Sequence, residues 1–146
     1  MNLNTFTNKL TKFVIEILFF ACIIAILTIP WWGNFAMFYF MIGKGMYVVL
    51  YLSGISCLFI LWQVRLFFKT FPDGNPFEQK NVIRLRKCAI ACFINATIFI
   101  VKILIVYTNA SFLLAILFGL AGLACLTIKD LFKQGIKHKQ ENDLTI

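Results

Sequence analysis

The sequence has few charged residues, and acidic residues are especially scarce. Charged residues make up 14% of the 146-residue chain and hydrophobic residues 61%, whereas a soluble domain has about 25% charged and about 45–50% apolar residues. Because so small a soluble core cannot cover this much apolar surface, the composition argues strongly against an ordinary soluble enzyme. Aromatic residues, at 16%, exclude a disordered chain. We therefore expect an integral membrane protein.

The sequence also lacks the groups of residues that carry most enzyme chemistry. His138 is the single histidine, and no His/Cys cluster has the spacing of zinc ligands. No glycine-rich segment matches a nucleotide-binding motif. The five cysteines lie in or beside apolar runs, where free thiols act as small packing residues. We therefore expect no enzymatic activity, no metal and no cofactor.

Four apolar stretches are long enough, or nearly so, for the roughly 20 residues that a membrane helix needs. They cover residues 13–31, 46–68, 88–107 and 112–128. Only a tight turn with Thr108, Asn109 and Ser111 separates the last two, which predicts a helical hairpin. The expected fold class is all-α, a single polytopic membrane domain of four transmembrane helices. Residues 69–87 form a loop with an amphipathic helix, and residues 129–146 form a tail.

Basic residues gather on one side of the predicted spans. Two precede the first span, six lie in the last turn of the second span or between it and the third, and four follow the fourth, together 12 of the 14 lysines and arginines. Cytoplasmic segments carry the excess of Lys and Arg in membrane proteins. Both termini and the middle loop are therefore expected in the cytoplasm. Because this topology accounts for the net charge of +8, direct binding of nucleic acid is not expected.

Apart from Arg65 in the last turn of the second span, two charged residues lie within the spans, Glu16 and Lys102. At about 1.5 Å of rise per residue, Glu16 lies only about 5–6 Å beyond Lys12, whereas Lys102 lies about 21 Å from the start of its span. A direct pair is therefore not expected. Lys102 can extend to the outer headgroups, and Glu16 can meet Lys12, Arg65 or Arg86 at the inner depth.

Other polar side chains share the inner depth with Glu16 and suggest a network between the helices. Its candidate members are Glu16, Gln63, Asn95 and Thr127. Two interpretations stay open, packing contacts between helices or a buried site that responds to protons or a ligand. Ala115, Gly119 and Gly122 form a face of small residues that lets another helix approach, from the same chain or from a second copy in a homo-oligomer.

The connection between the first two spans, residues 31–45, is aromatic rather than polar. Trp and Tyr favour the headgroup level, so this segment is expected to lie in the outer interface or to start the second span early. It is either a belt that anchors the protein or a docking surface for a lipid or an apolar peptide.

The loop before the third span contains a helix start. Pro72-Asp73-Gly74 predicts a turn. Asn75 is a good N-cap, Pro76 suits the first helical position, and Glu78 completes a capping box. A helix is therefore expected to begin at Pro76 and to run into the third span.

Two motifs resemble a known family. They are Gly74-Asn75-Pro76-Phe77, followed by Asn81, Leu85 and Arg86, and the terminal Glu141-Asn142-Asp143-Leu144-Thr145-Ile146. Over nearly its whole length the chain resembles the small four-span bacterial membrane proteins grouped as domain of unknown function 2975. Members are commonly encoded beside a small helix-turn-helix regulator of the Cro/C1 type. The family has no established activity, so the resemblance implies a bacterial cell membrane and a neighbour rather than a mechanism.

The expected function is therefore a membrane-bound regulatory or sensory protein that holds or releases a small DNA-binding partner. The alternative is a resistance or immunity protein that binds an antimicrobial peptide or lipid at the outer aromatic segment, and a minor transporter subunit ranks below both. The two motifs are expected to form one partner-binding surface, with the acidic tail folded back on the basic loop or both clasping the partner. Its candidate residues are Asn75, Pro76, Phe77, Asn81, Arg84, Arg86, Glu141, Asn142, Asp143, Leu144, Thr145 and Ile146.

Overall fold

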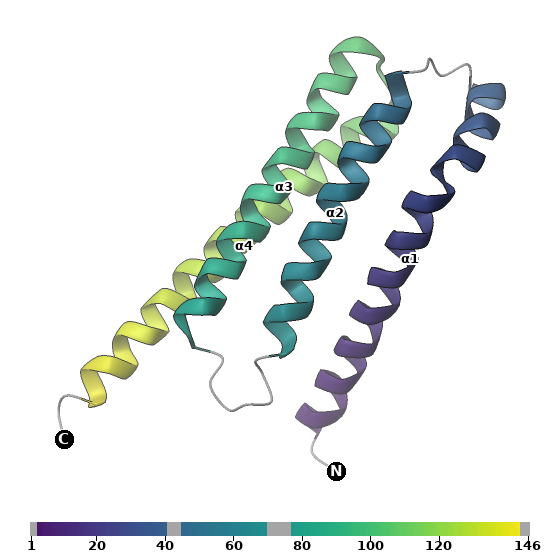
Figure 1. The fold of residues 1–146 in the computed structure, drawn as a ribbon. Helices are drawn as coiled ribbons and strands as arrows, with labels where there is room; N and C mark the ends of the chain where they lie inside the picture. The colour runs from purple at the N-terminus through teal and green to yellow at the C-terminus, as the bar shows by residue number, and fades with distance from the viewer. Residues whose placement is uncertain (1–2, 41–44, 70–76, 144–146) are drawn as a thin grey trace.

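The computed structural model consists of four long helices joined by short connections (Figure 1). It describes residues 3–40, 45–69 and 77–143, and no strand occurs in these ranges. The helices are α1 (Leu3–Phe40), α2 (Gly45–Lys69), α3 (Gln79–Ile105) and α4 (Asn109–Asp143). Each contains a stretch that is long and apolar enough to cross a membrane. The expected all-α fold with four transmembrane helices is confirmed.

The helices pack in the order in which the chain makes them. α1 packs on α2, α2 on α3, and α3 on α4, and the last pair makes the most extensive contact. Figure 1 shows α1 at one flank, separated from the α3–α4 pair by α2. α1 begins and α4 ends at the same end of the molecule (Figure 1), which we call the terminal end. The α3–α4 connection lies at the opposite end, which we call the hairpin end.

The connection at the hairpin end is even tighter than the sequence predicts. α3 ends at Ile105 and α4 begins at Asn109, so only residues 106–108 lie between them. The Val106 N–H donates to the Lys102 carbonyl over 2.8 Å, and the Ser111 N–H donates to the Thr108 carbonyl over 3.0 Å. These bonds satisfy backbone groups that helix ends leave without partners. The tight hairpin is confirmed.

α3 is the central helix of the fold. Its buried seam repeats at alternating steps of four and three residues, along Asn81, Leu85, Cys88, Cys92, Asn95, Phe99 and Lys102. Such a seven-residue repeat keeps one stripe of a helix against its neighbours. In its most apolar stretch 44% of residues are buried, against 6% in α2 and 11% in α1. The seam therefore defines the protein core, and lipid covers most of the other faces.

α3 begins later than the sequence predicts. Glu78 precedes the helix with an extended backbone, φ −112° and ψ 147°, and its side chain makes no capping hydrogen bond. The expected start at Pro76 with a capping box is therefore wrong. The Phe77 ring packs against α4, and this contact holds the chain extended until Gln79. Asn75 and Pro76 themselves lie outside the described residues.

α1 is also longer than expected. It continues through Pro30 as far as Phe40, and α2 begins only at Gly45. Residues 31–40 of the aromatic segment therefore extend the first helix and do not start the second one early. Membrane helices tolerate a proline because neighbouring groups satisfy the carbonyl that it leaves without a donor. The side chains of residues 32–45 lie outside the described part of the chain.

Candidate functional site

The candidate site lies at the terminal end, where α4 continues beyond its predicted span. Residues 129–143, which we call the α4 extension, add about 22 Å of helix at 1.5 Å per residue. Phe132 of the extension packs against Phe67 of α2, with ring centroids 5.5 Å apart, and against Phe77, with centroids 5.1 Å apart. We call these three rings the phenylalanine cluster. Aromatic pairs of this kind contribute about 0.5–1.5 kcal/mol each beyond their buried area, so the extension is fixed to the bundle.

Gly135 lets Phe77 approach the α4 extension. A Cβ atom at this position would lie 2.8 Å from two carbon atoms of the Phe77 ring, which is closer than van der Waals contact allows. The ring therefore occupies the space that a side chain would need. This contact places the chain segment before α3 directly on α4.

Arg84 joins α3 to the end of α2. Its Nη1 donates to the Leu66 carbonyl over 2.8 Å and to the Asn81 Oδ1 over 3.0 Å. The Leu66 carbonyl belongs to the last turn of α2, where no helical N–H is left to bind it. Asn81 is completely buried. Arg84 and Asn81 therefore hold the helix ends together.

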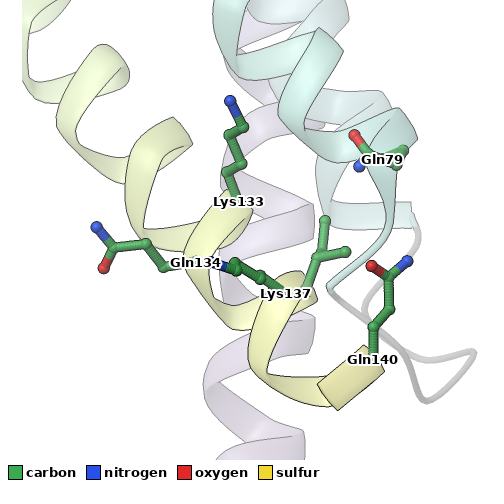
Figure 2. A pocket seen from close by; sticks show the side chains of 6 residues that line it. Gln79, Lys133, Gln134, Lys137 and Gln140 are labelled. Atoms are coloured by element: carbon green, nitrogen blue, oxygen red, sulfur yellow. The ribbon is translucent and has the colours of Figure 1, made fainter. Parts of the chain in front are cut away.

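A groove runs between the start of α3 and the α4 extension (Figure 2). Its volume is about 300 Å³, and its lining residues are Gln79, Lys133, Gln134, Ile136, Lys137 and Gln140. Ile136 is buried and gives the groove an apolar component. The polar lining consists of amides and two ammonium groups, so the groove suits a ligand with carboxylate or carbonyl acceptors beside an apolar group.

The structure divides the predicted partner-binding residues into three groups. Phe77, Arg86, Glu141 and Asn142 are exposed at the terminal end. Asn81 and Arg84 belong to the helix contacts described above, and the predicted surface role of Asn81 is wrong because a completely buried side chain cannot meet a partner. The remaining positions, Asn75, Pro76, Leu144, Thr145 and Ile146 together with the Asp143 side chain, lie outside the described part of the chain.

The ion pairs of the α4 extension run along the helix. Glu141 lies 3.8 Å from Lys137 and 3.6 Å from His138, both on the same helix. The extension is helical as far as Asp143. Up to that residue the chain continues as one helix. Within the described residues the tail therefore does not fold back onto the loop as expected.

The predicted intramembrane network is only partly assembled. Glu16 accepts a 2.6 Å hydrogen bond from the Arg65 Nε, which confirms one of its predicted neighbours. Asn95, completely buried, donates to the Cys57 Sγ over 3.9 Å, and Gln63 is buried on α2. The Thr127 hydroxyl is exposed and donates to the Leu123 carbonyl one turn back. Thr127 therefore faces away from the helix interfaces, and its predicted place in the network is wrong. The prediction used the depth of Thr127 along the helix, and depth does not fix the direction of a side chain.

Lys102 does not reach the outer headgroups as expected. It is 5% exposed, and its ammonium group donates to the Thr108 Oγ1 and, over 2.7 Å, to the Ser111 Oγ. The two hydroxyls also lie 2.7 Å from each other. The lysine bends inward because the hairpin supplies two polar partners within nine residues, which makes it a structural residue of the turn.

The groove was not predicted from the sequence. Most of its residues are polar and lie in the segment 129–146, which was expected to be a tail. One signal was available, since Lys133, Ile136, Lys137 and Gln140 recur at steps of three and four residues and thus share a helix face. No group of three His, Cys, Asp or Glu side chains among the described residues is placed to hold a metal ion.

The chain is similar to one family of known proteins. Residues 17–146 match the model of a family described as "Protein of unknown function (DUF2975)". Neither the curated proteins nor the solved structures gave a match. Because the match covers all but the first 16 residues and includes most of α1 and the whole of α2, α3 and α4, the chain belongs to the DUF2975 family of proteins of unknown function.

Proposed function

We propose that this protein is a membrane-bound regulatory protein that holds a small DNA-binding partner on its terminal end, which faces the cytoplasm. The observation that supports the proposal most is the α4 extension fixed by the phenylalanine cluster. A solvated tail needs no such attachment, whereas a binding surface gains from being held in one position. Regulation then follows from location, because a regulator bound at the membrane is withheld from DNA.

The chemistry of the groove indicates which surface of the partner binds. Lys133 and Lys137 are cationic, and Lys137 is 77% exposed, so they favour an acidic or carbonyl-rich segment of the partner. A DNA-binding protein keeps its basic surface for phosphate contacts. We therefore expect the partner to bind the groove through its acidic side. Its basic, DNA-binding surface is not attracted by the lysines of the groove.

The orientation of the protein is part of the proposal. Lysines and arginines are concentrated at the terminal end, which is the distribution of a cytoplasmic side. We further propose that the protein acts by binding rather than by catalysis. The bacterial cell membrane and the helix-turn-helix neighbour are implied by the family resemblance.

The experiment is purification of the tagged full-length chain from native membranes, followed by identification of a co-purifying helix-turn-helix protein. With the Lys133→Glu/Lys137→Glu variant, the amount of co-purifying partner should fall at least about 10-fold, because each contact between like charges in an interface is costly. The matched control is Lys87→Glu/Lys139→Glu, which changes the net charge equally outside the groove and should retain the partner. If no DNA-binding protein co-purifies with the wild type, the proposed function is wrong.

Deletion of residues 143–146 tests the tail separately. The truncated chain keeps the phenylalanine cluster and should keep its four-helix fold, while retaining less partner at the membrane. Equal retention by the truncated and full chains would show that the terminal motif is only a solvated end.

The second candidate function is a resistance or immunity protein that binds an antimicrobial peptide or lipid at the opposite face. One observation favours it, since Trp31 is 85% exposed and α1 continues nine residues beyond it. Expression that raises the inhibitory concentration of a membrane-active peptide, without any co-purifying regulator, would support this candidate over the first.

A further inference from the structure

A second concave site lies at the terminal end, between α1 and α2 and away from the α4 groove. Its volume is about 230 Å³, and its lining residues are Lys12, Ile15, Glu16, Arg65, Phe68 and Lys69. Lys12 and Glu16 are one turn apart on α1, and Arg65 and Lys69 are one turn apart on α2.

The site has an excess of positive charge. Three basic side chains face one carboxylate, that of Glu16, whose Oε1 accepts from the Arg65 Nε over 2.6 Å. Lys12 and Lys69 make no ion pair with any residue that the structure describes. A net charge of about two therefore remains for an anionic ligand.

Arg65 is oriented for such a ligand. Its guanidinium group is held by Glu16 through Nε and lies 5.3 Å from the centre of the Phe19 ring. The ion pair uses only Nε, so within the described residues the two terminal nitrogens keep their N–H groups for another acceptor. This end of a guanidinium matches two oxygens of a phosphate group.

The position of the site selects a lipid over a soluble anion. Lys12 precedes the first predicted span and Lys69 is the last residue of α2, so both lie at the level of the headgroups. Ile15 is buried and Phe68 half-buried; Ile15 follows Lys12 by about one turn and Phe68 directly precedes Lys69, so they offer an apolar wall beside the lysines. Basic pockets between membrane helices on the cytoplasmic side bind anionic lipid headgroups.

We infer that this site binds the phosphodiester of one anionic phospholipid, of the phosphatidylglycerol type, between Lys12, Lys69 and the terminal nitrogens of Arg65. Glu16 is a positioning residue that fixes the guanidinium. The lipid joins α1 to α2, which is the only helix on which α1 packs among the described residues. This inference rests on the proposed orientation but is independent of the proposed partner protein.

The test is native mass spectrometry of the purified full-length protein in neutral detergent, titrated with phosphatidylglycerol or phosphatidylcholine. The wild type should bind one phosphatidylglycerol at least about 10-fold more tightly than phosphatidylcholine. Lys12→Ala/Lys69→Ala should weaken phosphatidylglycerol binding by about 30-fold, roughly fivefold for each lysine near the headgroups. The matched control, Lys9→Ala/Lys80→Ala, removes two lysines of the same end from outside the site and should bind normally.

Three outcomes of these titrations, and a fourth from an arginine variant, would overturn the inference. The three are equal loss in the control, equal affinity for the two lipids, and equally tight binding of soluble glycerol phosphate, which would make the ligand a free phosphate. Lys12→Arg/Lys69→Arg keeps both charges and should restore binding. If this arginine variant remains folded but binds as weakly as the alanine variant, the positive charges do not bind the ligand and the site is not a phosphate site.

Discussion

α1 and α3 are both apolar enough to cross a membrane, but they occupy opposite positions in the fold. In their most apolar stretches 44% of the residues of α3 are buried, against 11% in α1. α3 carries Asn81, Asn95 and Lys102 on its buried seam, whereas α1 presents residues such as Leu27 and Phe13 to lipid. The comparison shows that mean hydropathy identifies a span, whereas the placement of polar residues identifies the central helix.

The largest expected effect comes from adding volume to the buried side of α3. Ala89 has no exposed surface, so Ala89→Phe forces its neighbours apart and should lower the free energy of unfolding by about 3 kcal/mol. Ala25→Phe, the same substitution on the exposed face of α1, should change it by less than about 0.5 kcal/mol. Unfolding by SDS in mixed micelles, followed by tryptophan fluorescence, measures both. Similar losses in the two variants would remove the distinction between central and peripheral helices.

A smaller effect is expected at the hairpin end of α3. Ser111→Ala removes one of the two hydroxyls that bind the Lys102 ammonium group, and hydrogen bonds to charged groups contribute about 1.5–3 kcal/mol. We expect a loss of about 2 kcal/mol in the same assay. Thr97→Ala is the matched control, because the Thr97 hydroxyl is exposed and bonds to the Phe93 carbonyl of its own helix. If the Ser111 variant were as stable as this control, Lys102 would have another partner.

The smallest effect is expected where α1 joins α2. Glu16→Gln keeps an oxygen acceptor for the Arg65 Nε, and the pair is partly exposed, with side-chain exposures of 35% and 27%. The change should cost less than about 1 kcal/mol, the range of exposed ion pairs. Glu78→Gln, at a carboxylate without a capping bond, serves as the control. A loss above 2 kcal/mol would make α1 a tightly held helix and would weaken the comparison with α3.

Hydropathy and charge were enough to predict the spans and to place Arg65 among three possible partners of Glu16. The spans follow from apolar length, and the hairpin follows from the short polar turn around Thr108. Depth limited the partners of Glu16 to Lys12, Arg65 and Arg86, but it did not choose among them. These properties depend on position along a helix, which the sequence gives directly.

The direction in which side chains point was harder to predict. Asn81 was expected on a surface and Lys102 at the headgroups, yet both belong to the seam of α3. A signal was present, since Asn81, Cys88, Asn95 and Lys102 are each seven residues apart. Spacing of this kind indicates one face of a helix, but it identifies the buried face only once the neighbours of the helix are known.

The contacts of Lys102 also have a consequence for how the chain enters the bilayer during biogenesis. A lysine costs about 2.5–3.5 kcal/mol on insertion scales at the centre of a membrane helix and less near its end, where Lys102 lies in the last turn of α3. Both of its hydrogen-bond partners, Thr108 and Ser111, follow within nine residues, so the ammonium group is solvated by the chain as soon as the hairpin closes. The charge of Lys102 therefore does not require α1 or α2 to be in place when α3 and α4 insert.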